Sequence, residues 1–544
     1  MSEVRLPASI VLDRPAVGDR AGSRPPGRAL LRLPDALAAR TAGWPGPVRR
    51  LGPPAVILLA GTVLRVWQLG AVGFNSDEAV YAGQAAALAG DPAASQLFPI
   101  FRAHPLLFQT SLSLLYRLGA GDVAARALVA AFGVATIGVV WLLGRLLYRH
   151  RVGLIAALFF ALMPYHVGVS RQVLLDAPMT FFATLTLYLF ARFCVHRSPL
   201  ALYAAALTMG LTVLAKETAV LLLGGLTVFA ILCPAVRPRW RPAAVAVAIT
   251  GLVVAAYPLS LQFSGRRSTG QNYLAWQLLR RANHTALFYL EVVPIAMGPG
   301  VVALALAGLW FLRRHGSWRE ALLLCWAGVP TVFFEVWPTK GYQYLLVTTP
   351  VVVILAARAV AALQVPRLRG PARAPATRLV RAGVVAVVAV SLAVPSWRQV
   401  DPEPTTTFLA GSGGLPAGRE MGRWMARNLP EGARVMTIGP SMANIVRFYG
   451  NRPAVGLSVS PNPISRNPSY EPIDNPDREL RRGTIHYVVW DAYTAGRTAF
   501  FADRLLRYVE KYHGIVLHTE SITVRSDDGS EVSKPVMIVY EVRP

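Results

Sequence analysis

Apolar runs of roughly membrane length recur along the chain and are separated by short polar connections. A helix of about 20 apolar residues is long enough to cross the hydrocarbon core of a bilayer. The pattern therefore predicts a polytopic α-helical membrane bundle of eleven spans. The runs lie near residues 52–70, 122–146, 152–168, 177–195, 199–214, 217–233, 242–261, 293–312, 319–336, 342–364 and 378–396.

Basic residues concentrate in every second connection between these runs. Connections rich in Lys and Arg remain in the cytoplasm. The alternation predicts a cytoplasmic N-terminus and an extracytoplasmic C-terminal region in a multi-pass plasma-membrane protein. The basic segments are the N-terminal tail, Arg145 to Arg151, Arg192 to Arg197, Arg237 to Arg241, Arg313 to Arg319 and Arg367 to Arg378.

The composition agrees with this topology, since 54% of the residues are hydrophobic and 15% are charged. A net charge of +26 would indicate nucleic acid in a soluble protein, but here the basic loops explain it and no nucleic-acid partner is expected. The strong preference for Arg over Lys indicates a GC-rich coding sequence of bacterial type. Three cysteines, Cys194, Cys233 and Cys325, have neither metal-ligand spacing nor the pattern of a disulfide framework.

The rest of the chain divides into a tail, two long outer loops and a polar C-terminal region. Residues 1–50 are rich in Arg, Pro, Gly and Ala, which predicts a disordered cytoplasmic tail ahead of the membrane domain at 51–396. The outer loops, 71–121 and 262–292, contain amphipathic stretches that predict short helices along the membrane surface. In the first loop these are Ala79 to Leu88 and Pro105 to Leu118.

Residues 397–544 alternate strand-like and helix-like segments, which predicts an extracytoplasmic α/β domain with a parallel-type sheet. No G-x-G-x-x-G motif is present, so a nucleotide site is not expected. The domain either holds an acceptor or braces the bundle, and the sequence leaves both roles open.

The candidate chemistry lies in the outer connections, where acids and cations gather on one face. Asp77, Glu78 and Asp176 lie at span boundaries, and a carboxylate there can deprotonate an acceptor hydroxyl. Arg and Lys can bind a phosphate, although either can also extend to lipid headgroups. The substrate-binding candidates are His104, Arg126, Arg171, Lys216, Lys340 and Tyr342.

Several short motifs occur in a recognisable order between about residues 55 and 350. In that order they resemble the polyprenyl-phosphate-sugar-dependent glycosyltransferases of the GT-C superfamily, in particular the protein O-mannosyltransferases and lipid A aminoarabinose transferases of family 39 type. The motifs are Asn75-Ser76-Asp77-Glu78-Ala79-Val80-Tyr81, His104-Pro105-Leu106, Ala124-Ala125-Arg126-Ala127 with Phe132-Gly133, Ser170-Arg171 to Asp176-Ala177-Pro178, and Lys216-Glu217.

The resemblance implies an inverting transfer of a sugar from a polyprenyl-phosphate carrier at the extracytoplasmic face. Asp77 would be the general base with Glu78 supporting it, and Asp176 would match the second acid of the family. Arg126, Arg171 and Lys216 would contact the donor or its phosphate. Some members use a divalent cation, so a metal is possible here, but no cofactor is certain.

Two questions stay open in the sequence. The acceptor can be a protein, a lipid or a polysaccharide, and the sugar is not specified. The alternative class is a polytopic transporter or lipid flippase whose outer carboxylates bind cations. A transporter is expected to keep ionisable groups near the middle of the membrane, whereas here they gather at the outer face.

Overall fold

The computed structural model describes residues 46–100, 104–265, 267–279, 282–364, 373–401, 414–526 and 528–543. Contacts divide the chain into two compact units, Met1–Gly52 and Pro53–Pro544, and every site discussed below lies in the second. The predicted disordered tail, apart from its last residues, lies outside the described residues.

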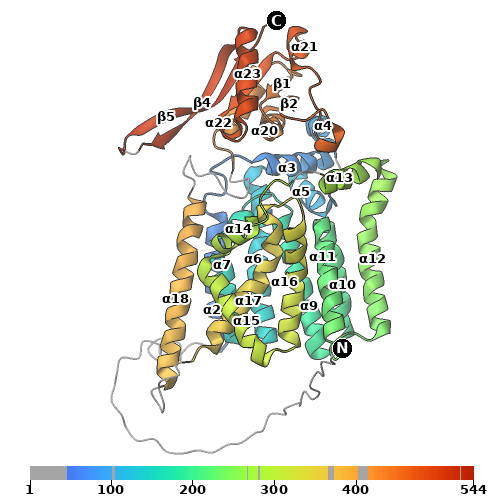
Figure 1. Ribbon diagram of the computed structural model, residues 1–544, viewed down its shortest axis with the longest axis vertical. Coiled ribbons are helices and arrows are strands. Elements are labelled where there is room, and N and C mark those ends of the chain that lie inside the picture. The colour runs from blue at the N-terminus through green and yellow to red at the C-terminus, as the bar shows by residue number, and fades with distance from the viewer. Residues whose placement is uncertain are drawn as a thin grey trace, which may run out of the picture. The chain divides into compact units, whose positions relative to one another are not determined.

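Each of the eleven predicted apolar runs coincides with helical structure, and Figure 1 shows the long helices side by side. By length and composition, five of the described helices can cross a membrane, or six if one bent pair counts as a single span. The helices of the bundle are α2 (Gly46–Val66), α6 (Asp122–Leu147), α7 (His150–Leu162), α9 (Asp176–His196), α10 (Pro199–Ala215), α11 (Leu221–Leu232), α12 (Trp240–Phe263), α14 (Phe288–Met297), α15 (Pro299–His315), α16 (Trp318–Val336), α17 (Thr349–Ala362) and α18 (Arg373–Val400).

The predicted span at 293–312 is not a straight helix. The chain bends by 105° between α14 and α15, at Gly298. Gly298 has φ +89°, a left-handed conformation that favours glycine, and Pro299 then begins the new helix. The run at 152–168 is also divided, because Pro164 starts a separate short helix, α8 (Pro164–Val169).

Short helices in the outer loops confirm the amphipathic stretches predicted there. The first loop forms α3 (Ser76–Ala89), α4 (Pro92–Leu97) and α5 (Leu107–Arg117), and the second forms α13 (Arg267–Leu279). Figure 1 shows α3 and α13 running across the end of the bundle rather than along it.

The C-terminal region forms a five-stranded sheet in the order β2-β1-β3-β5-β4. The predicted parallel arrangement is correct for β1 with β2 and β3, but β5 is antiparallel to both of its neighbours. β4 ends at Arg525 and β5 begins at Glu531, a separation too short for a crossover, so the two strands pair as a hairpin. The elements are α19 (Gly418–Asn428), β1 (Val435–Thr437), α20 (Pro440–Gly450), β2 (Ala454–Gly456), η3 (Pro463–Ser465), α21 (Pro476–Arg481), β3 (Tyr487–Asp491), α22 (Ala492–Ala495), α23 (Ala499–Lys511), β4 (Ile515–Arg525) and β5 (Glu531–Glu541).

One hydrophobic core joins the first outer loop to the C-terminal domain. Phe74 and Phe108 from the loop belong to the same buried cluster as Met421 of α19 and Met442 and Ile445 of α20. Burying a Phe side chain contributes roughly 1.5–3 kcal/mol. The domain therefore packs directly on α3, the helix that carries the acidic pair at its N-terminus.

Candidate active site

The start of α3 separates the two adjacent acids of the sequence. Asn75 caps the helix, because its side chain accepts from the backbone N–H groups of Asp77 and Glu78. The Glu78 carboxylate in turn accepts from the Asn75 backbone N–H at 3.0 Å, which completes a capping box. Glu78 is turned into the protein and is 0% exposed, whereas the Asp77 side chain is exposed.

Glu78 forms a buried ion pair with Arg126 of α6, at 2.7 and 2.8 Å. Its Oε1 also accepts from the backbone N–H of Val173 at 2.9 Å. The other N–H groups of Arg126 donate to backbone carbonyls, so all five N–H donors of the guanidinium have partners. These carbonyls belong to Leu69, Val72 and Gly73. These contacts form a fixed link between α6 and the start of α3, and the expected contact of Arg126 with donor phosphate stays a prediction.

Asp77 is the free acid of this group. In the part of the chain that the structure describes, no hydrogen bond or ion pair to its carboxylate is present. Its side chain reaches solvent, but the protein around it removes enough hydration to raise the pKa of Asp77. Lys216 opposes this rise, and Asp176 adds to it. Asp77 can therefore take up a proton more readily than an ordinary aspartate.

Two paired groups lie near Asp77. Lys216, just after α10, donates to Asp176 Oδ1 at 2.7 Å, and the exposed fractions of these residues are 6% and 2%. His104 Nδ1 lies 2.8 Å from Glu217 Oε2, and both side chains are partly exposed. Lys216 keeps donor capacity, because an ammonium group has three N–H donors and Asp176 accepts one. The site thus has one free base beside a buried cation.

Arg171 has a different environment from the one expected. Its guanidinium donates to the backbone carbonyls of Leu64 at 3.0 Å and Trp67 at 2.7 Å, at the end of α2. These contacts satisfy carbonyls that a helix end leaves without partners. Two of its N–H groups therefore hold the end of α2, and Arg171 is half-buried there.

Lys340 and Tyr342 support a separate part of the bundle. Lys340 Nζ donates to the carbonyl of Glu335 at 2.5 Å and lies 5.1 Å from the ring centre of Tyr289. The carbonyl of Tyr342 accepts from the Tyr165 hydroxyl. These contacts hold the end of α16 and the beginning of the next span.

The C-terminal domain is hydrogen-bonded to the start of α3. The Tyr449 hydroxyl accepts from the Phe74 N–H at 2.8 Å and donates to Asp122 Oδ2 at 2.5 Å. Asn444 Nδ2 donates to Ser76 Oγ at 3.1 Å. Ser76 directly precedes Asp77, so the domain helps to fix the backbone that presents the free acid.

Replacing Tyr449 with Phe removes this hydroxyl and leaves the buried Phe74 N–H without its partner. An unsatisfied buried donor costs about 1–3 kcal/mol. We expect a lower thermal unfolding temperature for Tyr449→Phe in purified protein. Tyr508→Phe, whose hydroxyl accepts from Arg504 at 3.2 Å elsewhere in the domain, is the matched control. Equal unfolding temperatures for the two variants would contradict this role of Tyr449.

A divalent cation does not fit the described residues of this site. No group of three or more His, Cys, Asp or Glu side chains with metal-binding geometry occurs among them. Asp176 is engaged by Lys216, and Glu78 by Arg126.

Sequence patterns identified the acids but not all of their neighbours. For Glu217 the sequence did contain a signal, namely its position directly after Lys216. Tyr81 had a weaker one: it lies four residues after Asp77, on the same side of α3. Nothing in the sequence indicated Tyr449 or Asn444, which reach α3 only through the docking of the distant domain.

The comparisons with known proteins agree with this architecture. Residues 103–261 match the family model described as dolichyl-phosphate-mannose-protein mannosyltransferase. No curated protein matches the sequence. Apo ArnT from Cupriavidus metallidurans is 16% identical with a TM-score of 0.64, over 92% of this chain and 98% of that chain. A second ArnT structure, bound to undecaprenyl phosphate, has a TM-score of 0.62 at 15% identity and covers 91% of this chain and 98% of that one.

Two further structures share the fold. The oligosaccharyltransferase AglB from Archaeoglobus fulgidus is 14% identical with a TM-score of 0.58, over 90% of this chain and 75% of that chain. The arabinofuranosyltransferase AftD from Mycobacteria has a TM-score of 0.52 at 16% identity, and the match covers 91% of this chain but 40% of AftD.

The chain therefore shares its fold with ArnT, AglB and AftD, and its residues 103–261 match the mannosyltransferase family model.

Proposed function

We propose that the chain is an inverting glycosyltransferase that moves a sugar from a polyprenyl-phosphate carrier to an acceptor hydroxyl, with Asp77 as general base. The observation that carries the proposal is the contrast between Asp77 and its neighbours. Asp77 is exposed and unpaired among the described residues, whereas Glu78 and Asp176 are buried in ion pairs. A general base must be accessible to the acceptor hydroxyl that it deprotonates, and of these three acids only Asp77 meets that condition.

In the proposed reaction, Asp77 accepts the proton of the acceptor hydroxyl. The hydroxyl oxygen then attacks the anomeric carbon of the donor from the face opposite the phosphate. The bond between that carbon and the phosphate oxygen breaks, and its electron pair leaves with polyprenyl phosphate. A single displacement of this kind inverts the configuration at the anomeric carbon.

Lys216 is the proposed contact for the donor phosphate. It is the cation that most strongly affects Asp77, and the ammonium group retains donors that Asp176 does not use. Asp176 positions Lys216, and the His104–Glu217 pair lies beside them as a second source of positive charge when His104 is protonated. Phosphate binding here places the leaving group near the base without neutralising it.

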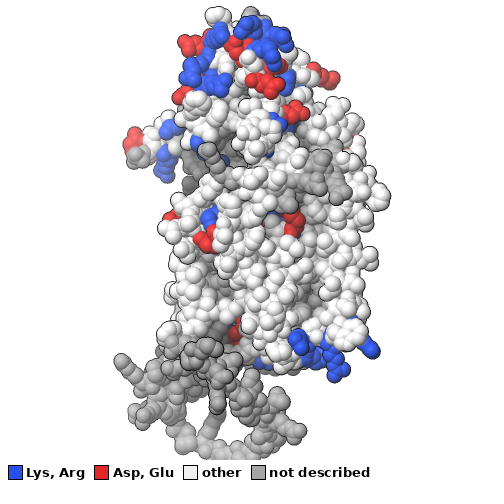
Figure 2. Space-filling model, turned by 45° about the vertical axis from the view of Figure 1, so that its right-hand side comes forward, with Lys and Arg blue, Asp and Glu red and all other residues white. Residues whose placement is uncertain are grey.

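The proposed reaction takes place at the extracytoplasmic face. Figure 2 shows Lys and Arg gathered at the far end of the helix bundle and on the C-terminal domain, with a mostly uncharged surface between them. Arg237 and Arg239 lie in the connection between α11 and α12, and Arg241 lies in the first turn of α12. Their preference for the cytoplasm supports an outer location for Asp77 and the C-terminal domain.

The transporter alternative is less well supported by the bundle. Arg65, one of several buried cations, lies in the last turn of α2, close to the outer loops. Its guanidinium donates to the carbonyls of Gly61 and Ala161 and contacts His166 Nδ1. An ion pathway instead needs polar groups near the middle of the bundle.

A donor-cleavage assay tests the proposal. Purified protein in lipid nanodiscs, incubated with polyprenyl-phosphate mannose labelled in the sugar, should release polyprenyl phosphate and pass the label to an acceptor. If membranes that contain the protein release no more polyprenyl phosphate than membranes without it, with any sugar tested, the proposal fails.

The pH dependence of transfer follows from the raised pKa of Asp77. A base works when deprotonated, so activity is lost as the pH falls through this pKa, and the loss should occur at a higher pH than for an ordinary aspartate. Lys216 lowers the pKa of Asp77, so Lys216→Gln should move the acid limb of kcat/KM to still higher pH. An acid limb that stays in place in Lys216→Gln would show that another group is titrating.

A further inference from the structure

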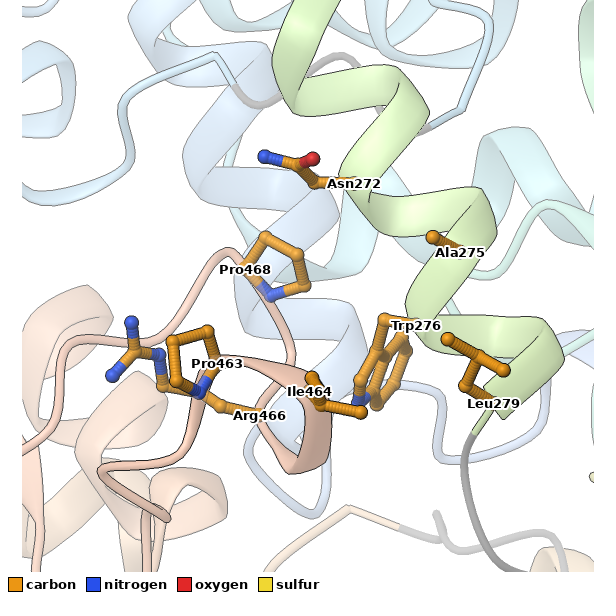
Figure 3. A pocket seen from close by; sticks show the side chains of 8 residues that line it. All are labelled: Asn272, Ala275, Trp276, Leu279, Pro463, Ile464, Arg466 and Pro468. Atoms are coloured by element: carbon orange, nitrogen blue, oxygen red, sulfur yellow. The ribbon is translucent and has the colours of Figure 1, made fainter.

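A cavity of about 410 Å³ lies between α13 and the segment around η3 in the C-terminal domain. Figure 3 shows its two walls: the helix contributes Asn272, Ala275, Trp276 and Leu279, and the domain contributes Pro463, Ile464, Arg466 and Pro468. A volume of this size is typical of small-ligand sites. It is far larger than a single water molecule needs.

The lining combines an aromatic surface with hydrogen-bond donors. Trp276 and Ile464 face each other across the cavity, and Ile464 is 61% exposed although it is strongly apolar. Asn272 contributes a side-chain amide. The Arg466 guanidinium makes one long hydrogen bond, 3.3 Å, to the carbonyl of Pro461. No carboxylate is among the lining residues. Sugar rings suit such a site, because their C–H faces pack on aromatic rings while their hydroxyls accept from amide and guanidinium groups.

A row of aromatic rings connects this cavity to the acid at the start of α3. Trp276 contacts Tyr273 on the same helix, with ring centres 5.5 Å apart. Tyr273 contacts His104 at 5.6 Å, and His104 contacts Tyr81 at 6.2 Å. Tyr81 lies one helical turn from Asp77.

The wall of the cavity that the C-terminal domain contributes is also connected to Asp77. Tyr470, shortly after Pro468, lies beside Asn444, whose side chain lowers the pKa of Tyr470 and donates to Ser76 Oγ. Burial raises the pKa of Tyr470, and the negative charge of Asp77 adds to the rise, so this hydroxyl lies within electrostatic reach of the acid. Side-chain contacts therefore connect both walls of the cavity to Asp77, although the cavity itself lies several side chains away from it.

We propose that the cavity binds a sugar residue of a long saccharide acceptor, at a distance from the hydroxyl that is glycosylated. This inference rests on the proposed function and specifies its acceptor as a saccharide chain. Trp276 stacks on the sugar ring, and Arg466 and Asn272 bind its hydroxyls. The saccharide acceptor then extends along the row of aromatic rings toward Asp77. The cavity's distance from Asp77 means that a single sugar cannot occupy both places.

Saturation-transfer NMR on the full chain in nanodiscs tests the site without requiring turnover. The probes are hexasaccharides of mannan, arabinan and galactan. At least one should bind the wild type, with its Kd raised about three- to tenfold by Trp276→Ala and by Arg466→Ala. The matched controls are Trp240→Ala and Arg482→Ala, at exposed positions outside the cavity, which should leave the Kd unchanged.

Two outcomes overturn the inference. One is that none of the hexasaccharides binds the wild type, as expected for a peptide acceptor. The other is that the cavity variants bind as tightly as the controls. Donor cleavage, measured on the same preparations, separates this failure from that of the proposed function: a protein that cleaves the donor but binds no saccharide keeps the function and loses the saccharide acceptor.

Discussion

Asp77→Asn should lower the rate of sugar transfer by about 10² to 10⁴, the usual range for loss of a general base. The amide has nearly the same shape as the carboxylate but cannot accept the hydroxyl proton. The Asp77 carboxylate makes no hydrogen bond within the described residues, so the substitution should leave the fold and the unfolding temperature unchanged. Transfer is measured with labelled polyprenyl-phosphate mannose, and thermal unfolding on the same protein.

The control for this experiment is Asp474→Asn, which changes an exposed acid in the C-terminal domain. It should retain full activity. Near-normal transfer by Asp77→Asn would assign the base to another group. Asp176 would then be the next acid to test, since it lies close enough to affect the pKa of Asp77.

Arg126→Ala should have the largest effect on stability. Removing one partner of a buried ion pair leaves the other charge uncompensated and costs about 3–5 kcal/mol. Glu78, at 0% exposure, would then keep only its backbone and Asn75 contacts. We expect a markedly lower unfolding temperature, together with weak transfer because the start of α3 is no longer held.

Arg117→Ala is the matched control, since Arg117 is exposed and makes one long hydrogen bond of 3.4 Å to the Leu88 carbonyl. The same measurements separate the two roles considered for Arg126. If Arg126→Ala unfolds at the wild-type temperature but binds the donor poorly, Arg126 contacts the donor phosphate, as the sequence resemblance implied.

The sequence predicted where the helices lie, because apolar runs of this length fold as helices in a bilayer. Only five of the described helices, or six with one bent pair, are long and apolar enough to cross a membrane, so the eleven spans stay a prediction. The sequence did not predict the bend between α14 and α15, although Gly298-Pro299 in the middle of the run was a signal for one. The hairpin of β4 and β5 was likewise read as part of a parallel sheet. Pairing direction depends on the length of the connection, and Asp528-Gly529 marks a tight turn there.

The site was predicted less completely than the fold. Adjacent residues of a helix point in different directions, so Asp77 and Glu78 could not share one role. The capping box was the available clue, since Asn75 and Glu78 have its three-residue spacing. Arg126 was expected at the donor because an Arg in an apolar run needs an anionic partner, and the partner proved to be Glu78. Docking of the C-terminal domain depends on tertiary contacts that leave no periodic pattern.

A structure of the complex with polyprenyl phosphate is the most direct test of the proposed mechanism. We expect the phosphate to lie within hydrogen-bond distance of Lys216 Nζ, with the Asp77 carboxylate facing the place of the departed sugar. A phosphate bound at the basic end of the bundle, or at the outer end but held by Arg171 or Lys340 away from Asp77, would contradict it.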